Sequence, residues 1–233
     1  MNVIIVAAGG SRRMGFDKLL APLAGETVLW HSIHALASCS EVTGLTLVTR
    51  DAFLFEGSAL AESAALGKPV KTVVGGAERH LSVWAGMQAV DPKTTHVAVH
   101  DAARPLVTAG AVAGCLALAQ IRGAAICATP VVDTIKRSGD GGIVEESVDR
   151  SGLWAMQTPQ IFELPLLREA YLQVIEAGVI VTDEGSAVQR LGSPVALYHN
   201  EDLNFKITLP RDLALAELVM KARNSLMPKE FSK

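Results

Sequence analysis

The chain has 233 residues, of which 49% are hydrophobic and 19% charged, and its formal net charge is −3. This composition is typical of a folded globular protein and excludes a disordered or collagen-like chain. The slightly acidic balance, without any stretch dense in Lys and Arg, argues against a nucleic-acid partner, which would need a basic surface to displace counterions.

Short apolar runs alternate with longer segments of helical spacing along most of the chain. The runs predict strands at residues 3–7, 45–49, 70–74, 96–99, 124–128, 195–199 and 205–208. The longer segments predict helices at residues 28–38, 53–66, 78–90, 109–121, 164–177 and 212–223. Apolar strands separated by helices favour a mainly parallel sheet covered on both faces. We therefore expect one α/β domain over residues 1–233, with a doubly wound, Rossmann-like sheet.

Residues 133–157 interrupt this alternation. Two polar, β-prone segments flank the turn Gly139-Asp140-Gly141-Gly142, and they are too hydrophilic for a core element. The pattern predicts a protruding hairpin arm. Because an isolated hairpin is only marginally stable in water, we expect this arm to pack on a second copy of the chain and form a homodimer.

The loop after the first predicted strand combines glycines with cations. It reads AAGGSRRMGFDK from Ala7 to Lys18. Glycines let a backbone approach a ligand closely, successive amide protons can hold phosphate oxygens, and the Arg and Lys side chains can hold a polyphosphate. Phe16 and Asp17 stand where a Walker A loop needs Lys-Ser/Thr, and the spacing is not G-x-G-x-x-G. The loop therefore predicts a polyphosphate site of another kind, with a flexible turn carrying surface cations as the alternative.

A second candidate site residue is Asp101, in the segment VHDAARP after the fourth predicted strand. In doubly wound sheets ligands bind at the carboxyl ends of the strands, which is where this aspartate falls. A carboxylate there can hold Mg²⁺ against triphosphate oxygens. The alternative is that Asp101 caps the following turn with Arg104 as its partner.

The cysteines and the apolar start predict a cytoplasmic protein. Cys39, Cys115 and Cys127 lie far apart in apolar segments, which indicates buried reduced thiols. The apolar run at residues 3–8 is too short for a signal or membrane helix, and no basic segment precedes it. We expect no membrane partner.

The glycine-rich loop resembles the signature of nucleotidyltransferases that join a nucleoside monophosphate to a phosphorylated small molecule. Further motifs follow in order: DT at 133–134, VDR at 148–150, LWAMQTPQ at 153–160, VTDE at 181–184 and NFKIT at 204–208. Together they resemble the 2-C-methyl-D-erythritol 4-phosphate cytidylyltransferase family of the non-mevalonate isoprenoid pathway, which has a glycosyltransferase-A-like fold. The resemblance runs from residue 3 to about residue 218.

This resemblance implies roles for individual residues in binding CTP and a phosphorylated polyol. Nucleotide binding is implied for Ala7, Ala8, Gly9, Gly10, Gly75, Gly76, Ser82 and Ala102. Asp101 would hold Mg²⁺ or another hard divalent cation, with Asp202 as a second candidate ligand. Binding of the polyol phosphate is implied for Arg104, Thr134, Arg150, Thr182 and Lys206, with Thr134 and Arg150 reaching across the dimer.

The implied reaction is one in-line attack of a phosphate oxygen on the α-phosphorus of CTP. A phosphate monoester is an adequate nucleophile at neutral pH, so no general base is assigned and none of the six histidines is given a catalytic role. The main obstacle is repulsion between two anions, which positioned cations reduce. The catalytic residues are then Arg13, Lys18, Arg150 and Lys206, of which the last two orient the attacking phosphate.

Simpler interpretations of several of these residues remain. Thr182 can serve as a helix N-cap, Arg150 as a solvated charge, Gly75-Gly76 as a turn, and Ser82 as a helix-interior residue. Lys206, expected inside an apolar strand, needs an anion from Asp202 or a ligand phosphate.

Two departures from the family pattern leave other functions open. Ala77 stands where the family usually has Asp, so that Glu78 is left to supply the contact, and the glycine-rich loop is two residues shorter before its lysine. The alternatives are a ribitol 5-phosphate cytidylyltransferase, a molybdenum cofactor nucleotidyltransferase, and a non-catalytic nucleotide-binding regulator.

Overall fold

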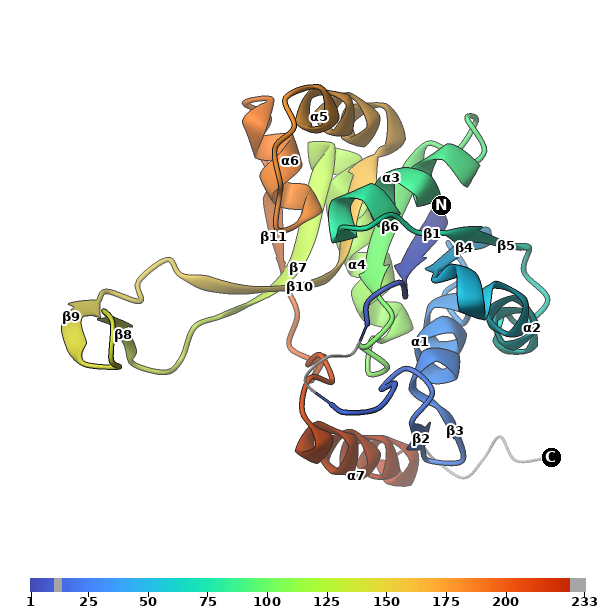
Figure 1. Cartoon of the computed structure of the whole chain (residues 1–233), viewed down its shortest axis with the longest axis horizontal. Helices are drawn as coiled ribbons and strands as arrows, with labels where there is room; N and C mark the ends of the chain where they lie inside the picture. The colour runs from blue at the N-terminus through green and yellow to red at the C-terminus, as the bar shows by residue number, and fades with distance from the viewer. Residues whose placement is uncertain (11–13, 227–233) are drawn as a thin grey trace.

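Seven strands form one sheet in the computed structural model, which describes residues 1–10 and 14–226 (Figure 1). Their order is β11-β7-β10-β6-β1-β4-β5. The strands are β1 (Asn2–Val6), β4 (Gly44–Thr49), β5 (Val70–Val74), β6 (His96–Asp101), β7 (Ala124–Pro130), β10 (Trp154–Glu163) and β11 (Ala196–His199). Only β10 runs antiparallel to its neighbours, β6 and β7. The predicted α/β class with a mainly parallel sheet is confirmed.

Helices cover both faces of this sheet. They are α1 (Val28–Ala37), α2 (Leu54–Ala64), α3 (Arg79–Ala89), α4 (Ala109–Arg122), α5 (Leu164–Glu176), α6 (Glu184–Arg190) and α7 (Pro210–Leu226), with a 3₁₀ turn η1 (Asp51–Phe53) before α2. Val3 and Ile5 of β1 pack among residues of α1, α2 and α4, whereas Ile4 packs among residues of α3, α5 and α6. Alternate residues of one buried strand therefore serve two cores, as expected for a strand that is apolar on both sides.

The sequence sets several helix boundaries through local hydrogen bonds. The hydroxyls of Thr27 and Thr108 accept from backbone amides in the first turns of α1 and α4, and the carboxylate of Asp183 does so in α6. Such N-caps satisfy amides that have no partner within the helix. At the other end of α4, Gly123 adopts a φ of 81°, which ends the helix and turns the chain into β7.

A third, smaller core holds α7 against a short ribbon of β2 (Pro22–Leu23) and β3 (Glu26–Thr27). Ile207 is completely buried in this core, although the predicted strand at 205–208 is wrong, because that segment forms no ladder. One backbone bond, from the Ile207 amide to the Ala103 carbonyl at 2.8 Å, ties it to the loop after β6. Its apolar side chains pack on a helix instead of continuing the sheet.

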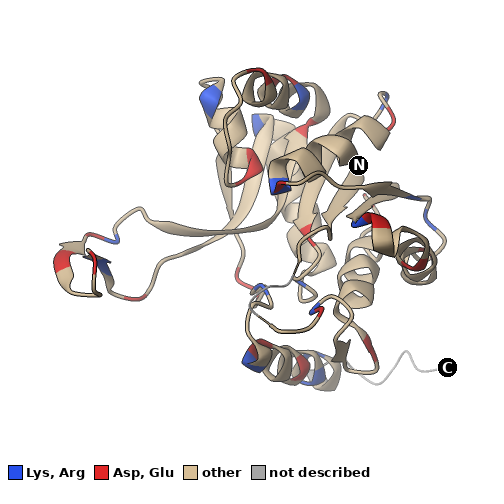
Figure 2. Cartoon of the chain, in the orientation of Figure 1, with Lys and Arg blue, Asp and Glu red and all other residues tan. Residues whose placement is uncertain are grey.

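An arm occurs within the predicted segment 133–157. Two short strands, β8 (Ile135–Ser138) and β9 (Val144–Val148), pair at its tip, away from the body (Figure 1). Both signs of charge gather at this tip (Figure 2), where Arg137 and Glu146 form an ion pair of 2.5 Å. The strand β10, which begins at Trp154, leads from the arm into the middle of the sheet.

Sequence periodicity missed both β10 and α6. The buried half of β10 contains Thr158 and Gln160, whose polar side chains hide the strand pattern. In the sheet both are hydrogen-bonded: the Thr158 hydroxyl accepts from the Asp101 amide, and the Gln160 side chain donates to Asp183 and accepts from the Gly185 amide. No helix among the described residues is long and apolar enough to cross a membrane.

Candidate active site

A cavity of about 680 Å³ opens where the carboxyl ends of β1 and β6 meet the N-terminus of α3. Ten residues assigned from the sequence line it: Ala7, Ala8, Gly9, Gly10, Lys18, Gly76, Ser82, Asp101, Ala102 and Lys206. Ala77 and Glu78 also line it, so the position of the family's missing Asp faces the same space. The expected grouping of loops at one edge of the sheet is confirmed for these residues.

Backbone hydrogen bonds hold the walls of this cavity in place. The Ala7 amide donates to the Val48 carbonyl at 2.7 Å, and the Gly75 amide donates to Thr49 at 2.8 Å. A side chain at Gly75 would bring a Cβ to 2.7 Å from both the Ala8 Cβ and the Ser82 Oγ. Gly75 therefore sits behind the cavity wall and lets the glycine-rich loop approach α3.

Asp101 contacts three cationic side chains in this site. Its Oδ2 lies 2.8 Å from Lys206 Nζ and 3.7 Å from Arg104 Nε, and its Oδ1 lies 3.2 Å from Arg79 Nη2. Burial by itself would raise the pKa of Asp101, but the neighbouring charges of Arg79 and Lys206 outweigh it and hold this pKa well below its usual range. The carboxylate therefore stays ionised at neutral pH.

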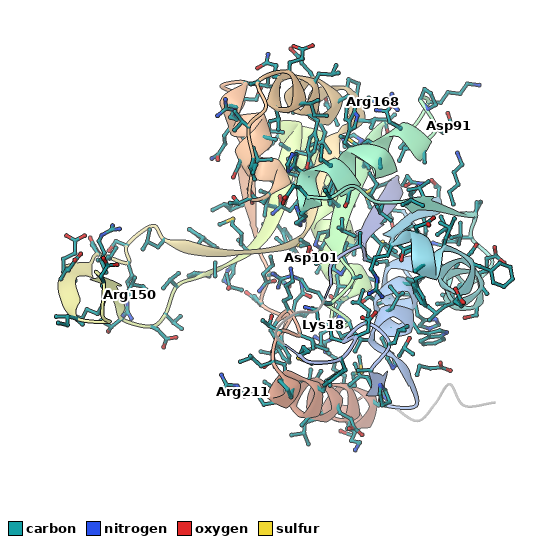
Figure 3. The ribbon with its side chains drawn as sticks, viewed as in Figure 1. Lys18, Asp91, Asp101, Arg150, Arg168 and Arg211 are labelled. Carbon is teal, nitrogen blue, oxygen red and sulfur yellow. The ribbon has the colours of Figure 1, made fainter. Side chains whose placement is uncertain are left out.

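The anion beside Lys206 is Asp101. The prediction named Asp202 or a ligand phosphate for this role, and Asp202 is wrong, because it is bonded to Thr108. The Lys206 side chain is 39% exposed, since it lies on the cavity wall and not within a strand. Lys18 also lines this cavity, and its Nζ donates to the carbonyl of Ile207, the residue after Lys206, at 2.8 Å. Figure 3 shows Lys18 and Asp101 on the same side of the body.

His100, directly before Asp101, takes part in a buried hydrogen-bond chain. The Asp101 amide donates to the Thr158 hydroxyl at 3.1 Å, and this hydroxyl lies 3.0 Å from His100 Nδ1. Nε2 of the same ring lies 3.2 Å from the Arg104 carbonyl, so it donates there. Burial lowers the pKa of His100 to about 4, which keeps the imidazole neutral at physiological pH.

Three other predicted residues lie outside the set that lines the cavity. Arg104 packs behind Asp101 and donates to the Asn204 carbonyl at 2.8 Å. Asp202 accepts from the Thr108 hydroxyl at 2.7 Å, at the start of α4. The Thr182 hydroxyl lies 3.3 Å from that of Ser186, and the alternative of Thr182 as an N-cap is wrong, because Asp183 fills that position.

The arm residues do not reach the cavity of their own chain. Arg150 donates to the Val132 carbonyl. Figure 3 shows Arg150 far from Lys18 and Asp101. Thr134 belongs to the same arm, directly before β8. Arg13 lies outside the described residues. The assignments of Thr134, Arg150 and Arg13 therefore stay predictions.

Sequence reasoning missed two charged residues of the site. Arg79, the first residue of α3, lines the cavity and contacts both Asp101 and Glu184. Glu184, the first residue of α6, is fully buried. The signals in the sequence were an arginine three residues after the glycine pair and an acidic residue two residues after Thr182, and neither indicates that the two side chains meet.

Comparison with known proteins identifies the family. The family model described as 2-C-methyl-D-erythritol 4-phosphate cytidylyltransferase matches residues 1–222. Proteins of that name from Symbiobacterium thermophilum and Prochlorococcus marinus are 43% and 41% identical to this chain. The matches cover 95% and 96% of this chain and 93% and 99% of theirs.

Solved structures agree with this assignment. The crystal structure of 2-C-methyl-D-erythritol 4-phosphate cytidylyltransferase from Thermus thermophilus is 34% identical, with a TM-score of 0.78 over 94% of this chain and 98% of that one. That of 4-diphosphocytidyl-2C-methyl-D-erythritol synthase from Anaerococcus prevotii is 26% identical, with a TM-score of 0.83 over 94% and 97%. The resemblance inferred from the motifs is confirmed, and the chain belongs to the 2-C-methyl-D-erythritol 4-phosphate cytidylyltransferase family.

Proposed function

We propose that this protein transfers CMP from CTP to 2-C-methyl-D-erythritol 4-phosphate, giving 4-CDP-2-C-methyl-D-erythritol and pyrophosphate. The observation that carries the proposal is the cavity in which the glycine-rich loop, Lys18 and Lys206 meet around Asp101. Family membership supports the same reaction and disfavours the ribitol phosphate and molybdenum cofactor alternatives. We place the reaction in the cytoplasm, in keeping with three buried free cysteines.

The chemical step is a single displacement at phosphorus. An oxygen of the acceptor phosphate forms a bond to the α-phosphorus of CTP, and the bond from that phosphorus to the bridging oxygen breaks and releases pyrophosphate. Such a step needs alignment and compensation of negative charge more than covalent chemistry. Lys18, together with Arg13, is assigned to the triphosphate, and Lys206 to the acceptor phosphate.

Asp101 is the residue assigned to hold Mg²⁺. No group of three or more His, Cys, Asp or Glu side chains suited to a metal ion occurs among the described residues, and Asp202 is bonded to Thr108 instead. A single carboxylate still fits, because Mg²⁺ in nucleotide enzymes commonly takes one or two carboxylates plus phosphate oxygens. When bound, the ion supplies charge compensation at the phosphates.

The acceptor site is proposed to be shared between two chains of a homodimer. Arg150 lies on the arm, far from its own cavity (Figure 3), and Thr134 directly precedes β8 of the same arm, while Arg104 and Thr182 belong to the body. Ile143 and Val144 of the arm are 74% and 58% exposed, and Val132 just before it is 75% exposed. Exposed apolar side chains on an extended hairpin favour a partner surface that covers them.

Pyrophosphate release from CTP and Mg²⁺ with each candidate acceptor tests the proposal. We expect release with 2-C-methyl-D-erythritol 4-phosphate and at most a trace with ribitol 5-phosphate or molybdopterin. Efficient turnover of either other acceptor would transfer the assignment to it. A complete lack of release with every acceptor would favour a non-catalytic nucleotide-binding protein.

A further inference from the structure

Glu184 is a buried carboxylate that no step of the reaction uses. Its side chain has no exposed surface, and three hydrogen bonds compensate its charge. Arg79 Nη1 donates to Oε1 at 2.6 Å and Arg79 Nη2 to Oε2 at 3.2 Å, while the Tyr171 hydroxyl donates to Oε1 at 3.0 Å. Burying an ion is costly even when it is paired.

Arg79 is shared between this carboxylate and the active site. The same Nη2 that bonds Glu184 lies 3.2 Å from Asp101 Oδ1, and Nε lies 3.4 Å from it. Burial opposes the charge of Arg79, but the two carboxylates outweigh that effect and raise its pKa. Arg79 is thus a fixed cation in the cavity wall, with its two terminal nitrogens bonded to Glu184.

The balance of charge around Asp101 depends on this sharing. Three cations surround that carboxylate, namely Arg79, Arg104 and Lys206. Glu184 offsets one of them by bonding Arg79 in the bidentate manner that guanidinium groups favour with carboxylates. Without the charge of Glu184, Arg79 is expected to turn its paired donors toward Asp101. Asp101 would then bind a metal ion more weakly.

We propose that Glu184 is a positioning residue that sets the affinity of Asp101 for a divalent cation by holding Arg79 partly away from it. This inference rests on the proposed function, in which Asp101 holds the metal. Glu184 then adds a second role to the segment VTDE at 181–184, which also contains Thr182, one of the residues assigned to the polyol phosphate.

The test measures Mn²⁺ binding to the full chain in the presence of CTP and without acceptor, by the enhancement of water-proton relaxation over that of the same Mn²⁺–CTP solution without protein. Glu184→Gln keeps the shape and an acceptor oxygen but removes the charge. We expect it to weaken Mn²⁺ binding about five- to tenfold, because one compensating charge is lost near a partly buried site. The control is Glu169→Gln, at an exposed position of α5, which is expected to match wild type.

A double variant separates positioning from general destabilisation. Arg79→Met with Glu184→Gln removes one charge of each sign, so the net charge near Asp101 equals that of wild type. We expect Mn²⁺ affinity to return to within about twofold of wild type, since interacting residues give non-additive effects. The double variant leaves no buried charge unpaired between positions 79 and 184, so it is expected to fold even if Glu184→Gln does not.

The outcomes separate this inference from the proposed function. Unchanged Mn²⁺ affinity in Glu184→Gln, or a double variant that binds as weakly as Glu184→Gln or more weakly, overturns the inference alone. If Glu184→Gln does not fold, a loss of Mn²⁺ affinity of more than about threefold in the double variant, relative to wild type, overturns the inference. Wild-type protein that binds no Mn²⁺ with CTP contradicts the proposed metal role of Asp101, and the inference with it.

Discussion

Lys206 and Asp101 lie 105 residues apart in the chain, yet Lys206 Nζ is 2.8 Å from Asp101 Oδ2. This ion pair joins the segment after β11 to the carboxyl end of β6, and both side chains line the same cavity. In the proposed reaction the pair keeps the lysine beside the place where two phosphate groups meet.

Replacing either lysine of the cavity should reduce turnover while the protein stays folded. For Lys18→Ala and Lys206→Ala we expect kcat to fall about a hundred- to a thousandfold, because one preorganised contact to developing charge is worth about 2.7–4 kcal/mol. The matched control is Lys221→Ala, since Lys221 is 67% exposed and pairs only with Glu217 on α7 in the described structure. Pyrophosphate release gives kcat and thermal unfolding reports the fold; near-native kcat in both variants would remove the catalytic assignment.

Gly75→Ala should weaken CTP binding without touching a charged group. Its added Cβ would lie 2.7 Å from the Ala8 Cβ, so the glycine-rich loop has to move away from α3. We expect KM for CTP to rise about tenfold or more, in line with the cost of overpacking. Gly110→Ala is the control, because its Cβ would meet nothing closer than 3.9 Å. Equal KM values for the two variants would show that the close approach at Gly75 does not shape the site.

The arm residues should act in trans if the acceptor site is shared. Lys18→Ala and Arg150→Ala homodimers are each expected to be nearly inactive. After the two are unfolded together and refolded, half of the dimers are mixed and each mixed dimer has one intact site, so about a quarter of wild-type activity should return. A mixture no more active than its parents, although subunit exchange is verified by mass, would place Arg150 in its own chain's site or in no site.

Stability should fall with pH between about 6.5 and 4 because of His100. Its pKa is lowered to about 4 by burial, so below pH 6.5 the unfolded chain binds a proton that the folded chain does not. The stability gained from a neutral His100 is complete above the unfolded pKa and declines as pH falls toward 4, by about 3 kcal/mol in all. His100→Gln keeps a donor for the Arg104 carbonyl and should flatten that part of the urea-unfolding profile. Profiles of equal slope would show that His100 is not the group responsible.

The sequence predicted well those parts of the site that depend on local order. The glycine-rich loop, Asp101 at a strand end and the GG segment after β5 each follow an apolar run, and their convergence at one sheet edge is a property of parallel sheets. The alternation of strands and helices was recovered in the same way. Each of these features is visible within a window of about twenty residues.

Contacts between distant polar residues were not predictable. Arg79 and Glu184 are 105 residues apart, and neither shows by its neighbours that it pairs with the other. The strand β10 was hidden because Thr158 and Gln160 carry buried hydrogen bonds at positions where the strand pattern calls for apolar residues. Lys206 was misplaced in a strand because Phe205 and Ile207 alternate with polar residues but pack on α7.

The most direct test of the account is a crystal structure of the protein with CTP and Mg²⁺. The account predicts the triphosphate against the backbone of Gly9 and Gly10, with Lys18 on its phosphates and the metal ion beside Asp101. A nucleotide bound elsewhere on the chain, with this cavity empty, would contradict it.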